Sequence, residues 1–371
     1  MSATTPMRVL LVSGTFPPGQ CGIGDYTARL ASALAALDGV RVGVLTQAPA
    51  GQTAAPGAEI LPVAASWGLA GLLSLLRRVR EWKPDIVHFH FPSQGFGLQL
   101  APALLPLACR LAGLAVVQTW HEPWPLLGAP RFLLQLAGAD GLVFVRPNYA
   151  ALLPRALRPL LRARMRRTIA SAGALPASRL AVHDRELLRA RYLSGKDRLV
   201  LFFGFIYPSK GVEQLFDIAD PRSHALVIAG PANDPAYLEQ LKTLAAQRGW
   251  GGQLQYTGFL AQQDAADLVA AADAVVLPFL GGGGDWNTSI HAALAQGTLV
   301  ITTAAQPRGD DPVRNLYTAG IGDIGAMRQA LNTLAGRRVA APPDDGWAPI
   351  ALSHAEFYAR VLDRPSAGAP G

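Results

Sequence analysis

The sequence has few charged residues and very few cysteines. Charged residues make up 16% of its 371 residues and hydrophobic residues 50%, which excludes an intrinsically disordered chain and allows large buried cores. Cys21 and Cys109 are the only cysteines, and their spacing fits neither a metal site nor a redox motif. No apolar run reaches the about 20 residues of a membrane span, and the N-terminus does not resemble a signal peptide. We therefore expect a reduced, cytoplasmic protein.

Two further motifs are missing. No Gly-x-Gly-x-x-Gly directly follows a predicted strand with an acidic residue about 20 positions later, so a nicotinamide-dependent dehydrogenase is a poor interpretation. The sequence also has no recognisable nucleic-acid-binding motif. Nucleic acid is therefore not an expected partner.

Positive charge is in excess and is concentrated in one stretch. The formal net charge is +7, and residues 146–167 contain seven arginines and no acidic residue. Leucines and alanines lie between these arginines, so a helix here would be amphipathic and basic. Such a helix fits an anionic surface at the inner face of the cell membrane, contacted between Arg155 and Arg167. A solvated surface helix is the alternative, and the sequence leaves both open.

Apolar strands alternate with helical segments through the first half of the chain. The spacing of Tyr26, Leu30 and Leu34 predicts an amphipathic helix after the first strand. Continuous apolar strands joined by helices form parallel sheets covered on both faces, so we expect a Rossmann-like domain at residues 1–176. The expected strands are 8–13, 40–45, 85–89, 115–119 and 141–145, and further helices are expected at 67–82 and 98–111.

The same alternation returns after Pro176. It predicts a second Rossmann-like domain at residues 177–346, which makes the whole chain an α/β protein of two domains. Ligands of open α/β sheets bind at the carboxyl ends of the strands, so we expect the site in a deep cleft across which the domains face each other. The expected strands are 199–203, 225–229, 254–256, 274–277 and 299–302, and the expected helices are 211–219, 237–248, 264–271 and 289–296.

The last part of the chain is predicted to be a loop followed by one helix. The loop covers residues 337–346, and the helix covers residues 347–364. A helical period places five residues on one side of this helix, which is the side expected to pack. They are Ile350, His354, Phe357, Tyr358 and Val361.

Sequence motifs occur in a fixed order along nearly the whole chain. They are FPPGQCGIGDYTARLASAL from Phe16, PDIVHFH from Pro84, TWHEPW from Thr119, TIASAGALP from Thr168, FFGFIYPSKGVEQLF from Phe202, LVIAGP from Leu226, YTGFL from Tyr256 and SIHAALAQGTLVITT from Ser289. Together they resemble the retaining glycosyltransferases of family 4, which have the GT-B fold. The sequence is most similar to a subgroup that lacks the family's Glu-x7-Glu pair.

The resemblance implies an architecture and a donor. The N-terminal domain would bind the acceptor, the C-terminal domain would bind the nucleotide sugar, and the final helix would cross back to the first domain. The donor substrate would be a nucleotide-diphospho sugar, with no metal and no other cofactor expected. The acceptor could be a glycan, a lipid-linked molecule or a small molecule, and the sequence does not decide among them.

The resemblance also assigns residues to the donor. Lys210 falls on the family's lysine and would neutralise the diphosphate as a point charge. The family's arginine, five residues earlier, is replaced by Phe205, so one phosphate contact is missing. The backbone is expected to approach the donor closely in the glycine-rich segments. The donor-binding residues of these segments are Gly22, Gly24, Gly204, Phe205, Gly230, Gly258 and Phe259.

A histidine and several polar residues of the first domain would face the reacting sugar and the acceptor. By resemblance His121 would contact the transferred sugar and act as a catalytic residue. The acceptor-binding residues would be Asp25, Tyr26, His90 and Glu122. His88 and His90 alternate around a strand residue and point to one face, but a metal pair is not expected.

The segment before and within the nucleotide-gripping helix lacks the family's two glutamates. Gly283 stands at the first position and His291 at the second, where an imidazole can still hydrogen-bond a ribose hydroxyl. Asp285 is expected to reach the sugar and to be catalytic. The helix start would cap the helix and offer amide groups to the diphosphate through its three N-cap-type residues. These residues are Asn287, Thr288 and Ser289.

Three functions remain open at this stage. The preferred one is an active, retaining, metal-independent hexosyltransferase. Because the family's arginine and glutamates are missing, an alternative stays open. It is a catalytically weak or inactive protein that binds a sugar nucleotide or a partner. A sugar-nucleotide epimerase would need carboxylates in the site, for which Glu122 and Asp285 are the candidates.

Overall fold

The computed structural model describes residues 5–47, 55–63, 67–122, 129–342 and 346–364. Contacts divide the chain into two compact units. Unit 1 holds the described residues up to Ser171 together with those from Gly346 onward, and unit 2 runs from Ala172 through the described residues before Asp345. Residues 343–345 of the loop expected at 337–346, and the last two residues of TWHEPW, lie outside the described residues.

Unit 1 is built on a parallel sheet, as its apolar strand segments predict. The described strands have the order β3-β2-β1-β4-β5-β6-β7, and every neighbouring pair is parallel. The central strands are buried along their length, which a sheet covered on both faces requires. The strands are β1 (Met7–Val12), β2 (Val40–Thr46), β3 (Glu59–Pro62), β4 (Ile86–Phe91), β5 (Ala115–Trp120), β6 (Gly141–Phe144) and β7 (Met165–Thr168).

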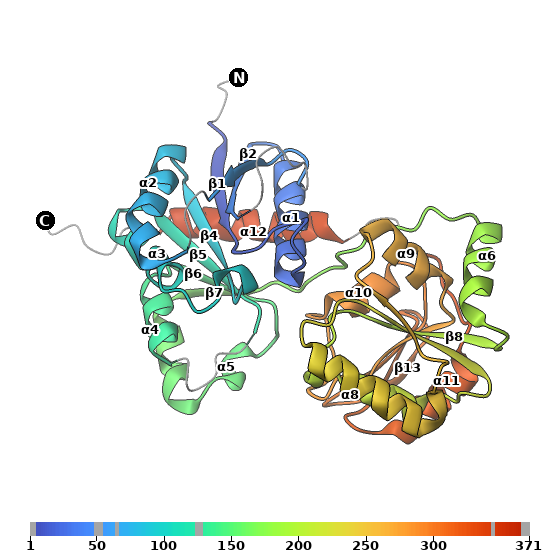
Figure 1. Cartoon of the computed structure of the whole chain (residues 1–371). Helices are drawn as coiled ribbons and strands as arrows, with labels where there is room; N and C mark the ends of the chain where they lie inside the picture. Colours follow the sequence, from blue (N-terminus) through green and yellow to red (C-terminus); the bar gives the residue numbers. More distant parts are fainter. Residues whose placement is uncertain (1–4, 48–54, 64–66, 123–128, 343–345, 365–371) are drawn as a thin grey trace, which may run out of the picture. The chain divides into compact units, whose positions relative to one another are not determined.

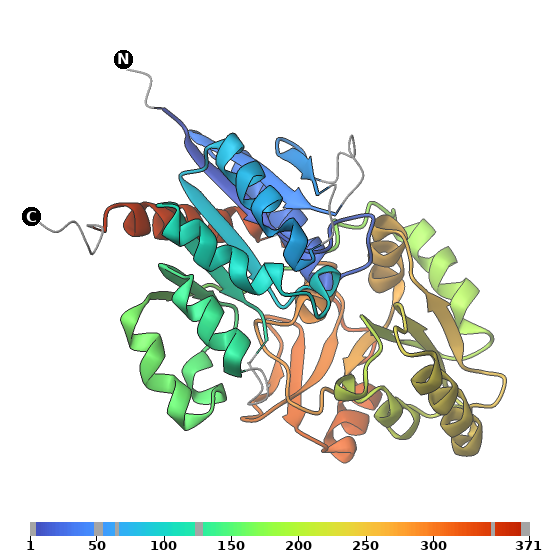
Figure 2. The ribbon, with the colours of Figure 1, turned by 60° about the vertical axis from the view of Figure 1, so that its left-hand side comes forward.

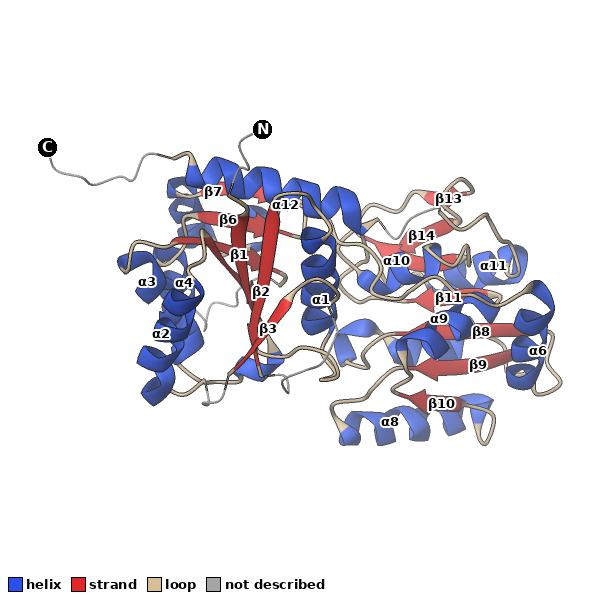
Figure 3. Ribbon diagram, turned by 90° about the horizontal axis from the view of Figure 1, so that it is seen from above, coloured by secondary structure: helices blue, strands red, loops and turns tan. Residues whose placement is uncertain are grey.

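Helices cover both faces of this sheet (Figure 3). Helices α1 (Gly22–Ala35) and α12 (Trp347–Leu362) lie on one face, and α2, α3 and α4 lie on the other. The remaining helices of the unit, with short 3₁₀ turns, are η1 (Leu69–Gly71), α2 (Leu72–Trp82), η2 (Gln94–Phe96), α3 (Ala101–Leu111), α4 (Ala129–Ala137), α5 (Tyr149–Leu152) and η4 (Arg155–Ala163).

The final helix belongs to unit 1, although it follows unit 2 in the chain. Figures 1 and 2 show α12, in red, beside the blue and cyan elements of unit 1. The side predicted to pack is buried, including Ile350, His354, Phe357, Tyr358 and Val361. The predicted return of the C-terminal helix to the first domain is therefore confirmed.

Unit 2 repeats the architecture with a second sheet. The described strands have the order β10-β9-β8-β11-β12-β14-β13, and only the β13–β14 pair among them is antiparallel. The two predicted Rossmann-like domains are confirmed. The strands are β8 (Arg198–Phe203), β9 (His224–Ala229), β10 (Gln255–Gly258), β11 (Ala274–Leu277), β12 (Val300–Ala304), β13 (Gly309–Asp311) and β14 (Leu316–Gly320).

Helices α7 to α11 of unit 2 contribute buried alanine and leucine side chains to the core that packs on this sheet. Helix α8 starts at Pro235 and is capped by the Asp234 carboxylate, which accepts from two backbone N–H groups. The helices and helical turns are α6 (Val182–Leu193), η5 (Pro208–Lys210), η6 (Val212–Gln214), α7 (Leu215–Ile218), α8 (Pro235–Ala245), η7 (Ala246–Trp250), α9 (Gln262–Ala271), α10 (Thr288–Leu294) and α11 (Ile324–Leu334).

The basic stretch at residues 146–167 does not form the expected amphipathic α-helix. It forms the short α5, the 3₁₀ helix η4 and the strand β7. Pro154 precedes η4 and Pro159 lies inside it. Each proline removes a backbone donor and clashes with the preceding turn, and together the two prolines disfavour a continuous α-helix here.

The sequence does not predict several other helices and strands, because their hydrophobic pattern is weak. Helix α6 has no buried residue, so it shows no apolar stripe. Strands β3, β7 and β13 are short edge strands with few buried side chains. In the described part of the chain no helix is long and apolar enough to cross a membrane.

Candidate functional site

Each sheet has a point where the order of its strands reverses. In unit 2 the chain runs outward from β8 through β9 to β10, and then returns to the other side of β8 to continue with β11 and β12. Ligands of doubly wound sheets bind at the carboxyl ends of the strands that flank such a point. The donor-binding residues predicted for this half lie at or after the carboxyl ends of β8, β9, β10 and β11.

Two of these strand ends approach each other through glycines. Gly204 and Gly230 have φ values of +139° and +143°, which side chains of L-residues rarely allow. A Cβ on Gly230 would lie 2.0 Å from the Gly204 carbonyl oxygen, and a Cβ on Gly204 would lie 2.8 Å from the Ser289 hydroxyl. Glycine at both positions therefore brings two backbones and the start of α10 together.

The turn that carries Lys210 is attached to the loop after β11. Gly211 has φ +66°, and a Cβ there would lie 2.2 Å from the Pro278 carbonyl oxygen. The Leu280 N–H donates to the Ser209 carbonyl at 3.2 Å. The Lys210 ammonium lies 4.8 Å from the centre of the Phe279 ring, a cation–π distance. Lys210 is thus held at the point where the strand order reverses.

The aromatic residues of this edge differ in their surroundings. Phe205, at the position of the family's arginine, stacks on Tyr207 with ring centres 6.2 Å apart. The Tyr207 hydroxyl accepts from the Asn233 amide at 2.9 Å. Phe259 is half exposed beside Gly258, whose carbonyl accepts from the Gly230 N–H. Position 205 therefore carries no positive charge, unlike the arginine that the family has there.

The start of α10 is only partly as predicted. Asn287 occupies the N-cap position, but its side chain accepts from the Gly284 N–H behind it and makes no cap hydrogen bond. The predicted side-chain capping by Asn287 is therefore wrong, because the glycine loop uses the same oxygen. Thr288 and Ser289 form the first turn, and no hydrogen bond of their N–H groups occurs among the described residues.

Asp285 and His291 lie together with an arginine that the sequence analysis missed. The Asp285 carboxylate pairs with the Arg314 guanidinium at 2.8 Å, and both side chains are largely exposed. The His291 Nε2 lies 3.1 Å from the Asp285 carbonyl oxygen, so the ring donates this hydrogen bond. Burial lowers the pKa of His291, with the Asp285 contacts opposing the shift. At neutral pH the ring is therefore an uncharged hydrogen-bonding group.

In unit 1 the strand order reverses between β1 and β4. The loop after β1 leads into α1, which starts at Gly22 and has Gly24 and Asp25 in its first turn. Burial raises the pKa of Asp25 to about 6, against the opposing charge of Arg29. A carboxyl with that pKa can give or take a proton near neutral pH, which suits acid–base chemistry.

A cluster of buried rings lies behind this helix start. Tyr26 contacts His121 edge to face at 4.7 Å and also contacts Trp347 of α12 at 5.1 Å. The Tyr26 side chain and His90 are almost fully buried, and His121 is partly exposed. His90 Nδ1 lies 3.4 Å from His121 Nε2. His121 is therefore the least buried ring of this cluster.

The cluster continues to the final helix. His88 bonds the Tyr358 hydroxyl at 2.6 Å through Nδ1 and the Thr119 hydroxyl at 2.7 Å through Nε2. His354 Nδ1 lies 2.9 Å from the Ile350 carbonyl oxygen, so Nδ1 carries the proton and Nε2 of the neutral ring does not. The bond between His88 and Tyr358 fastens α12 to β4, at the centre of the sheet.

All four histidines of the cluster are uncharged at neutral pH. Burial lowers the pKa of His121 to about 3 and that of His354 to about 4. Burial also lowers the pKa values of His88 and His90 well below the usual range, and neighbouring histidine charges add to the effect. Burial likewise raises the pKa of Tyr26 and of Tyr358, so both hydroxyls stay protonated.

We expect unit 1 to lose stability in acid. The unfolded chain binds protons at its histidines below pH 6.5, whereas folded His354 does so only below about 4. The stability that uncharged His354 contributes is thus complete above pH 6.5 and falls by about 3 kcal/mol as the pH approaches 4. Asp25 has a raised pKa of about 6, so its protonation stabilises the folded state as the pH falls and offsets part of this loss. Urea unfolding at a series of pH values measures the net loss.

A matched pair of variants tests this expectation. His354→Gln removes one of the titrating groups and should flatten the pH dependence. His183→Gln, at an exposed position of unit 2, should leave it unchanged. A free energy of unfolding that is constant between pH 6.5 and 4, or one that both variants alter equally, would refute the account.

Glu122 is held by unit 1 itself. Its carboxylate pairs with Arg146 at 2.7 Å, and its carbonyl accepts from the Tyr149 hydroxyl at 2.8 Å. The side chain is more than half exposed, so it is accessible to an acceptor. Its assignment to acceptor binding stays a prediction.

Candidate metal ligands are not clustered in the described part of the chain. No group of three or more histidine, cysteine, aspartate or glutamate side chains there could hold a metal ion. The rings of His88 and His90 are tilted by 33° with centres 4.4 Å apart, and both nitrogens of His88 are hydrogen-bonded to hydroxyl groups. The expectation of a reaction without metal or cofactor stays a prediction.

Family models match both halves of the chain. The model described as Glycosyltransferase Family 4 matches residues 21–175. The model described as Glycosyl transferases group 1 matches residues 197–336. Each match lies almost entirely within one of the two units. No curated protein matches the sequence.

Several solved structures resemble the chain over nearly its full length. Sucrose-phosphate synthase from Thermosynechococcus elongatus has TM-score 0.69 and 18% identity, covering 96% of this chain and 99% of its own. The Anabaena protein HepE in complex with UDP and glucose has TM-score 0.71 and 15% identity, covering 95% and 100%. The catalytic domain of starch synthase IV from Arabidopsis thaliana, bound to ADP and acarbose, has TM-score 0.73 and 14% identity, covering 97% and 100%. At these identities the likeness establishes a shared fold.

Proposed function

Because this chain is a glycosyltransferase of the GT-B type, we propose that it moves a sugar from a nucleotide-diphospho sugar to an acceptor with retention of anomeric configuration. The donor is held by unit 2 and the acceptor by unit 1, and the reaction uses no metal. The acceptor is a glycan, a lipid-linked molecule or a small molecule. The match to the family 4 model and the sequence motifs support retention.

One observation carries this proposal. The turn bearing Lys210 is attached to the loop after β11, at the point where the strand order of unit 2 reverses. The close approach of Gly204, Gly230 and Ser289 at the same edge leaves backbone without side chains there. A lysine ammonium and glycine backbone at one edge of the sheet suit a diphosphate. The UDP and ADP bound by HepE and by starch synthase IV agree with this ligand class.

The chemistry requires stabilisation of a leaving group. Negative charge develops on the nucleoside diphosphate as the sugar departs, and the Lys210 ammonium neutralises it. Neutral His121 contacts the transferred sugar, and Asp25 with its raised pKa of about 6 accepts the proton of the attacking acceptor hydroxyl. His291, also uncharged, hydrogen-bonds the ribose in place of the family's glutamate.

Asp285 provides a separate test of the donor site. We expect Asp285→Asn to lower kcat/KM about 10- to 100-fold through loss of a charged hydrogen bond to the sugar. Its ion pair with Arg314 is exposed, so stability should change by less than about 1 kcal/mol. Asp310→Asn is the matched control, because Asp310 also pairs with an arginine, Arg337, at 2.7 Å. Equal kinetics in the two variants would remove Asp285 from the site.

The experiment for the overall function is a donor panel. The protein is incubated with UDP-, GDP-, ADP- and dTDP-sugars and a range of acceptors, and nucleotide release and product anomers are followed by nuclear magnetic resonance. We expect release from one class of donor and a product with the donor's anomeric configuration. An inverted product would refute retention. Ligand-induced melting shifts without turnover would favour the alternative of a protein that only binds a sugar nucleotide.

A further inference from the structure

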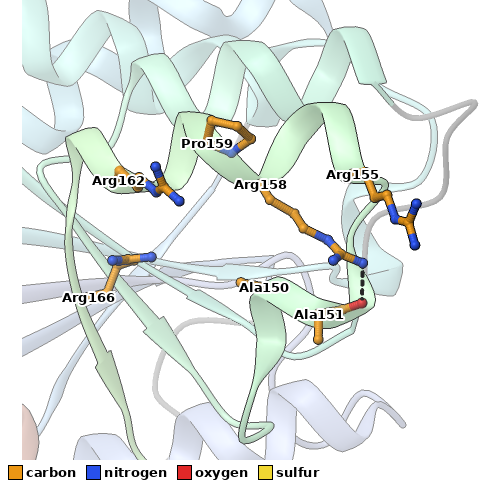
Figure 4. Close-up of a pocket in the computed structure, with 7 residues that line it drawn as sticks. All are labelled: Ala150, Ala151, Arg155, Arg158, Pro159, Arg162 and Arg166. Atoms are coloured by element: carbon orange, nitrogen blue, oxygen red, sulfur yellow. Dashed lines mark hydrogen bonds between the residues drawn. The ribbon is translucent and has the colours of Figure 1, made fainter.

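A surface groove of unit 1 is lined by four arginines. Figure 4 shows Arg155, Arg158, Arg162 and Arg166 around it, with Pro159 and two alanines of α5. The groove has a volume of about 580 Å³ and is open to solvent. None of the proposed donor or acceptor residues lines it, so it is not explained by the transferase site.

The local fold brings these arginines together. In the 3₁₀ helix η4, with three residues per turn, Arg155 and Arg158 lie on one side. The Arg158 guanidinium donates to the carbonyls of Ala151 and Leu153 at 2.8 and 2.9 Å, which joins η4 to α5 (Figure 4). Arg158 is therefore a structural residue of the groove. The other three arginines are exposed on η4 and β7.

The positive charge of the groove is not neutralised by the protein. The sequence has no aspartate or glutamate from residue 141 to residue 183. Among the described residues no ion pair involves Arg155, Arg158, Arg162 or Arg166. Like charges so placed repel one another, and folding alone gives no reason to gather them. An external anion would relieve this repulsion.

The chemistry of the groove points to phosphate groups on a lipid surface. Guanidinium groups bind phosphate oxygens with two parallel hydrogen bonds. Leu152 and Leu160, in the same segment, are 46% and 40% exposed. No aromatic side chain lines the groove, although single-stranded nucleic acid sites stack bases on aromatic rings. Arginines combined with exposed leucines are typical of surfaces that bind anionic bilayers.

We propose that this groove docks unit 1 onto an anionic phospholipid surface. Arg155, Arg162 and Arg166 hold lipid phosphate groups, and Leu152 and Leu160 enter the headgroup layer. The 3₁₀ geometry, rather than an amphipathic α-helix, sets the spacing of the arginines. The proposal is independent of the transferase activity, because its readout is binding to lipid.

Sedimentation with vesicles tests the proposal. The full chain is mixed with phosphatidylcholine vesicles with and without phosphatidylglycerol, at low and at high salt. The variant R155Q/R162Q/R166Q retains Arg158, and its matched control R77Q/R80Q/R360Q removes the same charge from exposed positions of unit 1. We expect the wild type and the control to bind anionic vesicles in a salt-sensitive way. The groove variant should bind about 100-fold more weakly.

Several outcomes would overturn the proposal. An equal loss of vesicle binding in both triple variants would show a general charge effect. Competition by soluble pyrophosphate with no preference for vesicles would indicate a free-phosphate site. Tighter binding to single-stranded RNA than to anionic vesicles would indicate nucleic acid. Circular dichroism and melting temperatures establish that the triple variants are folded.

A second variant tests the role of Leu152 and Leu160 in binding to vesicles. L152S/L160S keeps all the arginines, so it should retain binding at low salt and lose most of it at high salt, where charge attraction is screened. Salt dependence identical to that of the wild type would contradict entry of these leucines into the headgroup layer.

Discussion

Lys210→Ala is expected to lower kcat/KM about 100- to 1,000-fold. The Lys210 ammonium lies over the Phe279 ring, on a turn bonded to the loop after β11, where the diphosphate of the donor is proposed to bind. No arginine assists it from position 205, because Phe205 stands there. Loss of its charge should therefore remove most of the stabilisation of the leaving group. Steady-state kinetics with the donor identified by the panel measure the effect.

Lys242→Ala is the matched control for this prediction. Lys242 lies on α8 of the same unit and pairs with Glu239 at 2.7 Å on the surface. Such a pair contributes little, so the variant should keep full activity and nearly full stability. If Lys210→Ala retains wild-type kcat/KM, or if Lys242→Ala is equally impaired, Lys210 has no special role at the diphosphate.

Gly230→Ala is expected to destabilise unit 2 by about 4 kcal/mol. The new methyl group would lie 2.0 Å from the Gly204 carbonyl oxygen, and φ at this position is +143°. Backbone must therefore move at the ends of β8 and β9, the central part of the proposed donor site. Urea denaturation of the purified variant measures the change in the free energy of unfolding.

Gly258→Ala separates backbone conformation from crowding. Gly258 also has positive φ, at +66°, but a Cβ there would meet nothing within 4 Å. This control should cost only about 1 kcal/mol. Equal losses in the two variants would mean that the close approach of Gly230 to Gly204 does not determine the fold of this edge.

The sheets and the central helices could be predicted because their residues are buried in regular patterns. Strands such as β4 and β11 are buried along their length, and α12 shows a helical period with His354 and Tyr358 on its buried side. Edge strands and α6 escaped prediction because one or both of their faces meet solvent. The basic stretch differs from its predicted α-helix because Pro154 and Pro159 outweigh the helical pattern of its arginines and leucines.

The candidate site could likewise be predicted only in part. Glycines and Lys210 follow strand ends, so their common position at one sheet edge could be foreseen from topology. The ion pair between Asp285 and Arg314 could not be predicted, because Arg314 lies in the turn between β13 and β14. These two strands lack a clear sequence signal. Likewise, no periodicity predicts that Asn287 would bond Gly284 instead of capping α10.

The structure shows which groups stand at the positions of the two missing glutamates. At the position of the second, His291 is a neutral ring bonded to the Asp285 carbonyl, and at the first, Gly283 donates its N–H to Thr303 at 2.6 Å. A Cβ on Gly283 would lie 2.8 Å from the Thr302 hydroxyl, so a glutamate would require rearrangement here. We infer that the hydroxyl groups of sugar and ribose are recognised by different residues than in the wider family, with the diphosphate contact at Lys210 retained.

The most direct test of the account is calorimetric titration of UDP, GDP, ADP and dTDP into the wild-type protein and into Lys210→Ala. The account predicts that one nucleoside diphosphate binds clearly more tightly than the others, and that Lys210→Ala weakens its binding at least about tenfold, as loss of one charged hydrogen bond implies. Lys242→Ala should bind like the wild type. Failure of all four nucleotides to bind, or equal affinity of the wild type and Lys210→Ala, would contradict the assignment of unit 2 as the donor-binding unit.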